Sequence, residues 1–227
     1  ILHSNSGLYG ISFASIKKTS ETESAEVVKQ LKTEFPSLKI DILVTSGGFK
    51  EELQEFIRRH QIRAVVMGLE TKNRISKYIW GSHGIDIAGK INAPVITVPE
   101  KYKDHRLENM LIAVDNTEKL KSTSLKEIEK FSKATQSQVK LLHIRTPEEV
   151  FAPSQTVMIK FNGQKQEVEI TKSRNIEDGI RFYSRRNDID LVTIISRKHS
   201  VFYNLFRESV TKKVSYAANV PVMAIHE

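Results

Sequence analysis

The chain contains one structural unit twice, and this repeat constrains its fold more than any other feature. Residues 60–100 align with residues 187–227 without a gap. At this offset of 127 positions, Pro94 meets Pro221. A fixed offset over such a length indicates two copies of one folded unit rather than a solenoid of short repeats.

Upstream of the aligned segment the offset between the copies changes. ILHS at residues 1–4 resembles LLHI at residues 141–144, which is an offset of 140 positions. The first copy is therefore thirteen residues longer before its next strand, and the extra length falls in the region of the stretch SAEVVKQLKTEF. Val27, Leu31 and Phe35 recur there at helical spacing, so we expect a helix with these three side chains on one face.

The second copy contains two features that the first copy lacks. Asn162 and Gly163 predict a hairpin turn between two strands. About thirty residues before LLHI have the pattern of a strand followed by a helix, with Leu125, Ile128 and Phe131 pointing inward. We therefore expect the first unit to lack its first strand and helix in this chain.

Strand and helix patterns alternate along both copies. Strands are expected over 38–44, 63–68, 94–98, 110–115, 139–144, 166–171, 190–195 and 221–225, and helices over 22–35, 49–60, 82–91, 117–134, 175–186 and 207–218. The apolar runs VVM and LVTII are continuous, as in a parallel sheet that is covered on both faces. This alternation predicts an α/β fold of doubly wound, Rossmann-like parallel sheets. We expect two tandem domains, 1–100 and 109–227, joined by a linker over 101–108.

Both copies end in an apolar strand that follows a proline, in APVITVP and VPVMAIH. Each strand alone would leave a hydrophobic sheet edge open, and such an edge invites aggregation. We therefore expect the two domains to pack as an internal pseudo-dimer through the strands near 94–98 and 221–225.

Composition argues against several classes of function. The net charge is +8, but Lys and Arg stand beside Glu along the helical segments, as on a solvated helix face. Basic residues are not interleaved with aromatic ones as in RNA-binding sheets, so nucleic acid is not an expected partner. The histidines lack metal-ligand spacing and no G-x-S-x-G elbow is present, so we expect neither a metal site nor dedicated catalysis.

The sequence also bears on the compartment. There are no cysteines, which fits a reducing environment. No apolar run approaches the roughly 18 residues that a membrane helix needs, and the first residues lack the pattern of a signal peptide. We expect a cytoplasmic protein without a membrane contact.

The stretch VVMGLETKNRISKYIWGS contains the strongest candidate for a binding site. Gly68 ends an apolar strand, where a glycine permits a positive φ and close approach of a ligand to the backbone. Gly81 and Ser82 open the next helix, where free N–H groups and the helix dipole favour phosphate oxygens. The same residues also fit a turn and a helix cap without a ligand, so two interpretations remain open.

With these motifs in place, the chain resembles tandem universal stress proteins. The family motif is G-x2-G-x9-G-[ST], and this chain has Gly68-x2-Thr71-x9-Gly81-Ser82. IAVDNTEK resembles the family's first strand, whose aspartate binds the adenosine part of ATP; that residue is Asp115 here. The endings APVITVP and VPVMAIH resemble the strand that pairs across the family's dimers. The resemblance implies ATP or another adenine nucleotide as ligand, and a homodimer in addition to the internal pseudo-dimer.

The two copies depart from the family motif in different ways. Thr71 adds a Cβ where the loop should approach phosphate. In the second copy Ile195 and Glu208 replace the first and last glycines, and the carboxylate of Glu208 opposes phosphate by like charge. Each copy therefore keeps a different half of the pocket, although the basic loop SRKHS of the second copy could hold an anion by side chains. The expected nucleotide-binding residues are Met67, Gly68, Thr71, Gly81, Ser82, Asp115, Arg197, Lys198 and Ser209.

Two functional hypotheses follow from the resemblance and its departures. The first is a universal stress response protein that binds an adenine nucleotide weakly or acts through a protein partner, without dedicated catalysis. The alternative is a scaffold that works independently of nucleotide because both sites have degenerated.

Overall fold

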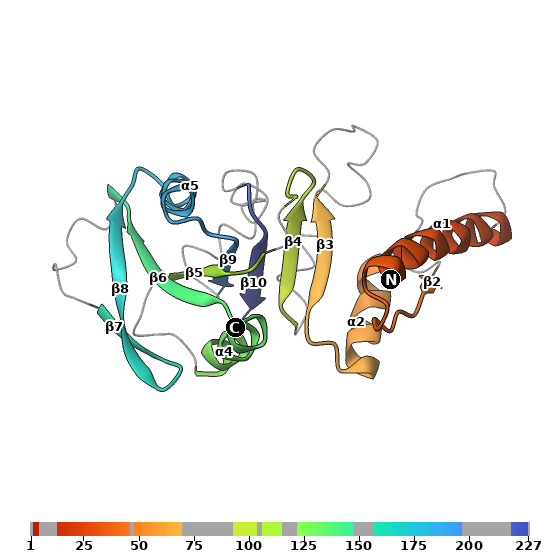
Figure 1. The fold of residues 1–227 in the computed structure, drawn as a ribbon, viewed down its shortest axis with the longest axis horizontal. Helices are drawn as coiled ribbons and strands as arrows, with labels where there is room; N and C mark the ends of the chain where they lie inside the picture. Colours follow the sequence, from red (N-terminus) through yellow and green to blue (C-terminus); the bar gives the residue numbers. More distant parts are fainter. Residues whose placement is uncertain are drawn as a thin grey trace. The chain divides into compact units, whose positions relative to one another are not determined.

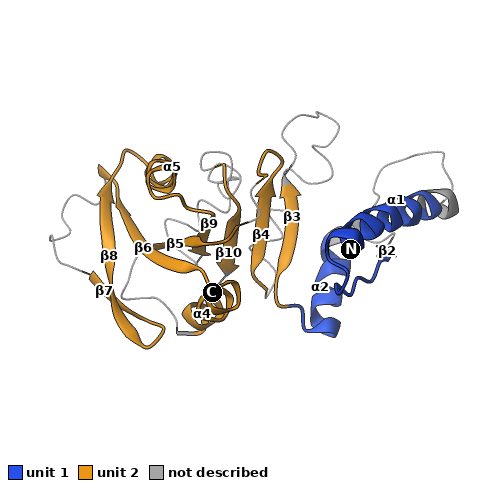
Figure 2. Ribbon diagram, viewed as in Figure 1, with its two compact units in different colours: residues 1–62 blue, residues 63–227 orange. Residues whose placement is uncertain are grey.

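A computed structural model describes most of the chain and divides it into two compact units. The described residues are 2–4, 13–45, 48–69, 93–103, 106–114, 122–147, 157–196 and 219–226. Unit 1 is Ile1–Ile62 and unit 2 is Arg63–Glu227 (Figure 2).

Unit 1 consists of two short strands and two helices. Its elements are β1 (Leu2–Ser4), α1 (Phe13–Glu34), β2 (Leu43–Thr45) and α2 (Phe49–His60). β1 and β2 form a two-stranded parallel sheet in which His3 pairs with Val44. β2 is shorter than the strand that the sequence predicts over 38–44 and begins later.

Helix α2 begins and ends at the residues that the sequence predicts, because its charged residues and its apolar face both indicate a helix over this range. Two glutamates lie in its first turn, and Arg58, Arg59 and His60 lie in its last turn. This arrangement complements the helix dipole. Leu53 is buried on the inner face, and the helix ends at Gln61, which has the left-handed φ of 47°.

Helix α1 does not bury the face that the sequence pattern indicates. Val27 is 46% exposed and Phe35 is 50% exposed, whereas Ser20 and Ser24 are buried. Val28 lies on the same side of the helix as the two serines. Val27 lies about 100° away from Val28, because each residue turns the helix by about that angle. The helix also starts at Phe13, nine residues before the predicted start. Small serine side chains allow close packing there, so an apolar period alone indicated the wrong face.

Unit 2 is built on one eight-stranded sheet in the order β3-β4-β10-β9-β5-β6-β8-β7 (Figure 1). The strands are β3 (Val65–Leu69), β4 (Val95–Pro99), β5 (Asn109–Val114), β6 (Gln138–Arg145), β7 (Val157–Phe161), β8 (Gln164–Lys172), β9 (Leu191–Ser196) and β10 (Val222–His226). The described helices are α4 (Ser122–Thr135) and α5 (Ile176–Arg186). All neighbouring strands are parallel except the pairs β4–β10 and β7–β8.

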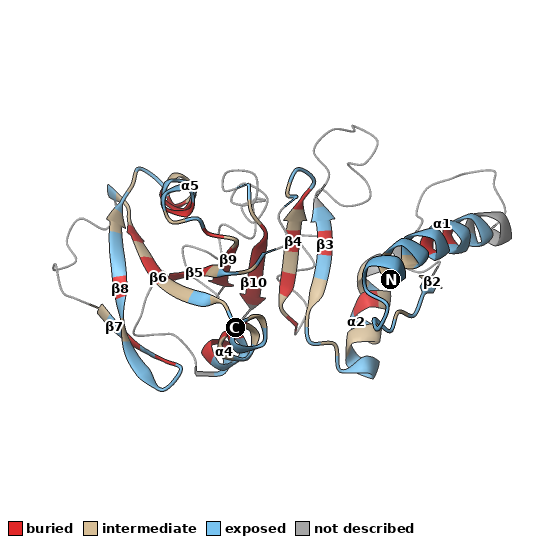
Figure 3. Ribbon diagram, viewed as in Figure 1, coloured by how far each residue is buried: buried red, intermediate tan, exposed pale blue. Residues whose placement is uncertain are grey.

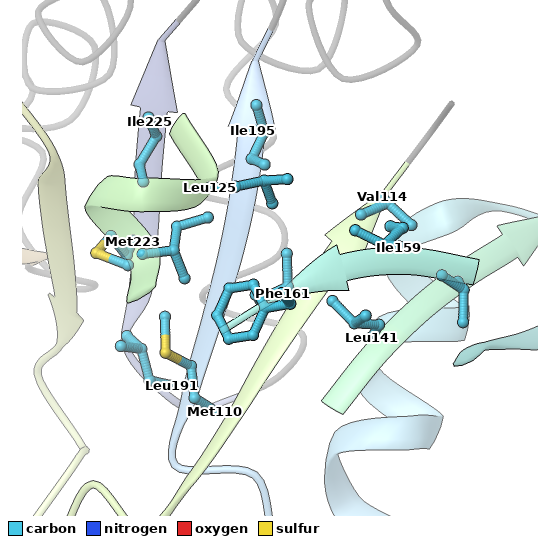
Figure 4. Close-up of a cluster of buried hydrophobic side chains, with 13 residues drawn as sticks. Met110, Val114, Leu125, Leu141, Ile159, Phe161, Leu191, Ile195, Met223 and Ile225 are labelled. Atoms are coloured by element: carbon cyan, nitrogen blue, oxygen red, sulfur yellow. The ribbon is translucent and has the colours of Figure 1, made fainter. Parts of the chain in front are cut away.

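The central strands of unit 2 are buried on both faces, as their continuous apolar runs predict (Figure 3). Along β5, Leu111 belongs to one hydrophobic cluster, whereas Met110 and Ile112 belong to a second cluster (Figure 4). Ile180 of α5 lies in the first cluster, and Ile128 of α4 lies in the second. The two helices therefore cover opposite faces of the sheet, which is the doubly wound arrangement that the sequence predicts for this part of the chain.

The predicted hairpin at Asn162 and Gly163 is confirmed. β7 and β8 pair in antiparallel fashion, with Phe161 opposite Gln164 across the turn. Asn162 has φ 51° and Gly163 has φ 79°. Positive φ values at both central residues are required by the type I′ turns that suit the twist of two-residue hairpins.

Helix α5 and helix α2 are followed by a left-handed residue at matching positions of the repeat, although their first turns are capped differently. The side chain of Asn175 caps α5, because its Oδ1 accepts a hydrogen bond of 2.8 Å from the Asp178 backbone N–H. After the helix, Asp188 has φ 47°, the value that Gln61 has after α2. Gln61 is the C-cap of α2, whereas Asp188 follows the C-cap Asn187 of α5, so the left-handed residue is kept although the two helices end one position apart in the repeat.

The strand register repeats in the same way. Val65 of β3 lies opposite Val95 of β4. Val192 of β9 lies opposite Val222 of β10. Each of the second pair stands 127 positions after its counterpart, so the two strand pairs have one and the same register.

The expected contact between the two final strands is present and symmetric. β10 pairs with β4 in antiparallel fashion, and Ile96 lies opposite Met223. On either side, Val222 pairs with Thr97 and Ala224 pairs with Val95. Because positions 95–97 match positions 222–224 in the repeat, exchanging the two copies reproduces the pairing. Such self-complementary pairing is the property of a two-fold interface.

Candidate functional site

Two parallel strands end directly before the candidate residues of the second copy. β5 ends at Val114, one residue before Asp115, and β9 ends at Ser196, one residue before Arg197. The two strands are neighbours, with Ala113 opposite Ile194. The chain therefore leaves both strands at their carboxyl ends, on the same side of the sheet. This is where ligands bind in open α/β folds. Asp115, Arg197, Lys198 and Ser209 themselves lie outside the described residues.

His143 on the neighbouring strand β6 fixes this end of the sheet. Its Nδ1 lies 2.9 Å from the carbonyl oxygen of Val114, to which the ring N–H donates. The ring is half-buried and its contact is with the last residue of β5. This bond holds the strand end that leads into Asp115, which is a structural role for the histidine.

Gly68 in the first copy lies in regular strand backbone. It pairs with Val98 of β4, and its φ lies outside the positive region, so the positive φ expected from the sequence is not used. A Cβ added at Gly68 would meet no described atom within 4 Å. The described fold therefore does not require a glycine at this position.

The other candidates of the first copy contribute less to the described structure. Met67 is buried, at 4% exposure, so its side chain belongs to the core. Only its backbone could face a ligand. Thr71, Gly81 and Ser82 lie outside the described residues.

The strand ends next to the candidate residues fall into two groups, which lie at opposite ends of the strands of the sheet. β3 runs parallel to β4, β4 runs antiparallel to β10, and β10 runs parallel to β9 and so to β5. The carboxyl end of β3 at Gly68 therefore points away from the carboxyl end of β5 at Val114. Gly68 and Val114 therefore lie at opposite ends of the sheet. The structure brings together the strand ends before Asp115 and Arg197, and it keeps Gly68 apart from both.

The position that matches Gly68 in the second copy is part of the core. Ile195 is 1% exposed and lies in one hydrophobic cluster with Val114 and Leu125 (Figure 4). Helix α4, which carries Leu125, covers this part of β9. The sequence shows only that a glycine is missing at residue 195, whereas the structure shows that a core side chain has taken its place.

Two acidic groups of the described residues have clearly shifted pKa values, and neither lies at these strand ends. Hydrogen bonds from Arg58 and then Arg59 lower the pKa of Glu55 on α2 to about 2. Burial raises the pKa of Tyr183 on α5, and the carboxylate of Glu169 adds to the rise. No group meets the Tyr183 hydroxyl in hydrogen-bonding geometry in the described structure.

The described residues contain neither a cluster of metal ligands nor a helix suited to span a membrane. The described part of the chain holds no group of three or more His, Asp or Glu side chains that could bind a metal ion. None of its described helices combines the length and the apolar character needed to cross a membrane.

Comparison with solved structures shows a shared fold. A universal stress protein from Archaeoglobus fulgidus DSM 4304 matches 99% of this chain over 83% of its own, with 16% identity and a TM-score of 0.66. A functionally unknown protein from Pseudomonas aeruginosa PAO1 matches 99% of this chain over 80% of its own, with 9% identity and a TM-score of 0.57. A candidate universal stress protein from Pseudomonas aeruginosa UCBPP-PA14 matches 99% of this chain over 91% of its own, with 8% identity and a TM-score of 0.57.

Sequence comparison adds no assignment. No protein-family model matches the chain, and no curated protein matches it significantly. At these low identities the structural likeness establishes a fold of the universal stress protein type, and it carries no information about ligand or activity.

Proposed function

We propose that this protein is a cytoplasmic stress-response protein of the universal stress type, which binds an adenine nucleotide weakly and has no dedicated catalysis. The observation that carries the proposal is that parallel strands end beside candidate residues in both copies, β3 just after Gly68 and β5 directly before Asp115. The carboxyl ends of parallel strands are where α/β sheets hold nucleotides. The fold likeness and the glycine motif of the first copy support the same ligand.

The two copies are proposed to form an internal pseudo-dimer, with a homodimer of the whole chain as a further assembly. The self-complementary pairing about Ile96 and Met223 supports the internal arrangement. So does the shared register of the strand pairs β3–β4 and β9–β10. Native mass spectrometry of protein purified without added ligand reports both the oligomer and any retained nucleotide.

Each copy is proposed to keep a different half of its own nucleotide site, since the carboxyl ends of β3 and β5 point in opposite directions. The first copy offers Gly68, Gly81 and Ser82 to phosphates, through backbone N–H groups and a helix N-terminus. The second copy offers Asp115 to the adenosine, but Glu208 places a carboxylate in the path of the phosphates. Binding is therefore weak, with the phosphates in the first copy.

Calorimetry with ATP on the parent and two variants tests this assignment. Gly81→Glu should abolish binding, through charge repulsion and loss of the backbone approach. Glu208→Gly should create or strengthen binding in the second copy. Unchanged, tight binding in Gly81→Glu would move the site to Asp115 and the loop that starts at Arg197.

One structural observation favours a second candidate function. Because Gly68 and Val114 lie at strand ends that point in opposite directions, the two half-sites cannot complement each other within one chain. A scaffold that binds partners independently of nucleotide fits this separation. Absence of ATP binding in the parent and in both variants would support the scaffold.

A further inference from the structure

An open groove of about 840 Å³ lies at the end of β8 and along helix α5, and none of the nucleotide-site candidates lines it. The groove is lined by the last residues of β8, the turn that follows, and one side of α5. Five cationic side chains line it: Lys172, Arg174, Arg181, Arg185 and Arg186. The groove is therefore strongly basic.

Internal ion pairs neutralise little of this charge. Asp178 is the one carboxylate in the lining, and it forms an ion pair with Arg181. The four other cations make no ion pair or side-chain hydrogen bond with a described residue. Four positive charges thus face the groove without a carboxylate partner in the described structure.

The repeat provides an internal comparison for two of these cations. Arg58 and Arg59 on α2 occupy the positions that Arg185 and Arg186 occupy on α5, 127 residues later. On α2, the Oε1 atom of Glu55 lies 2.7 Å from Arg58 Nη2 and 2.5 Å from Arg59 Nε. One carboxylate therefore forms ion pairs with both arginines of the first copy and offsets half of their charge.

The second copy has Phe182 where the first copy has Glu55. This phenylalanine is 62% exposed and lies in the groove lining beside the two unpaired arginines. An exposed aromatic ring on a charged helix face has no role in the core of its own domain. Exposed aromatic residues and arginines are enriched where proteins bind one another, and they contribute most of the binding energy there.

We propose that this groove binds an acidic segment of another protein, whose carboxylate bonds to Arg185 and Arg186 as Glu55 bonds to Arg58 and Arg59. An apolar side chain next to that carboxylate covers Phe182. Lys172 and Arg174, at the β8 end of the groove, attract further acidic residues of the same segment.

The internal comparison favours an acidic peptide over a nucleic acid. What the second copy lacks relative to the first is a carboxylate on the helix beside its pair of arginines. Nonspecific nucleic-acid grooves combine basic residues with several aromatic rings on which successive bases stack. Phe182 is the one aromatic side chain in the described lining of this groove.

Fluorescence anisotropy tests the proposal with a labelled peptide in which glutamates flank a single Leu-Phe pair. The full chain should bind it with an affinity that falls at high salt, because exposed charge pairs are screened. Phe182→Glu recreates the α2 arrangement on α5 and should weaken binding at least about tenfold. Arg185→Ala should weaken it too, and a peptide with glutamines in place of the glutamates should not bind.

The matched control is Lys160→Gln, which lowers the net charge by one, as Phe182→Glu does, at an exposed site on β7 outside the groove. It should bind the peptide like the parent. Circular dichroism of Phe182→Glu checks folding, which should hold because a glutamate already stands at this position of α2. ATP calorimetry on the same variant should be unchanged, so failure here is distinguishable from failure of the nucleotide proposal.

Three results would overturn the inference. The first is no peptide binding by the parent, and the second is equal binding by the parent and Phe182→Glu. The third is tighter binding of a single-stranded oligonucleotide that is lost in Phe182→Glu, since the groove would then serve nucleic acid.

Discussion

Replacing Gly68 by alanine separates a structural role for this glycine from a role in binding. The backbone at Gly68 already suits an alanine, because φ is not positive and an added Cβ meets no described atom within 4 Å. Glycine in a strand costs roughly 0.5–1 kcal/mol relative to alanine, owing to the freedom that it loses on folding. Gly68→Ala should therefore raise the free energy of unfolding by about 0.5–1 kcal/mol, measured by urea denaturation with circular dichroism.

Nucleotide binding should respond in the opposite direction. If phosphates approach the backbone at the end of β3, the new methyl group occupies the space that they need. ATP affinity should then fall at least about tenfold, which corresponds to roughly 1.4 kcal/mol in calorimetry. The result that refutes this reasoning is a Gly68→Ala variant that is more stable than the parent and binds ATP equally well.

The control is the same substitution at Gly163, in the hairpin turn between β7 and β8. Gly163 has φ 79°, which an alanine adopts only with strain, although an added Cβ has free space. Gly163→Ala should lower the free energy of unfolding by about 1–2 kcal/mol. ATP affinity should stay at the parental value, because the turn is not among the candidate site residues.

Three further predictions concern groups with unusual surroundings. Thr193→Val should raise the free energy of unfolding by about 1 kcal/mol in the same urea assay, because the buried hydroxyl has no hydrogen-bond partner in the described structure. Tyr183→Phe should leave that free energy unchanged or raise it by up to about 1 kcal/mol, for the same reason; a clear loss would reveal a partner for the hydroxyl. In an NMR titration Glu55 should show a pKa of about 2, set by Arg58 and then Arg59, so its stabilising contribution is present above pH 4.5 and is lost as the pH falls toward 2. Arg58→Ala should return this pKa toward its ordinary value of 4.5, and an unchanged value would contradict the ion pair.

Elements with strong local signals could be predicted from the sequence with nearly correct ends. In helix α2 the charged residues, the apolar face and the left-handed residue after the last turn all indicate the same helix bounds. The hairpin at Asn162 and Gly163 depends on two adjacent residues that tolerate positive φ. In both cases the deciding physics lies within a few residues of the chain, so no tertiary contact is needed to anticipate it.

The face of α1 and the backbone of Gly68 could not be predicted in the same way. Which side of α1 is buried depends on what packs against it, and Ser20 and Ser24 carry no apolar signal. Whether Gly68 needs a positive φ depends on how far β3 continues. β3 runs to Leu69, so Gly68 lies inside the strand rather than after it.

The basic groove on α5 was missed for a different reason. Arginines along a helix have the pattern of a solvated face, and in α2 that interpretation is correct because both arginines form ion pairs with Glu55 of the same helix. The signal was nevertheless present in the sequence. It appears when the two copies are aligned and Phe182 is seen at the position of Glu55.

The pairing of β4 with β10 also affects how this protein responds to dilution and to mutation. In a homodimer each interface residue is encoded once and occurs twice, so a single substitution changes both sides. Here Ile96 and Met223 face each other within one chain and are encoded separately, so either side can change while the other is retained. Covalent linkage also makes the association intramolecular, with an effective concentration set by the connecting chain instead of by the amount of protein. Dilution that would separate a homodimer therefore leaves this junction intact, and its two sides are free to change independently.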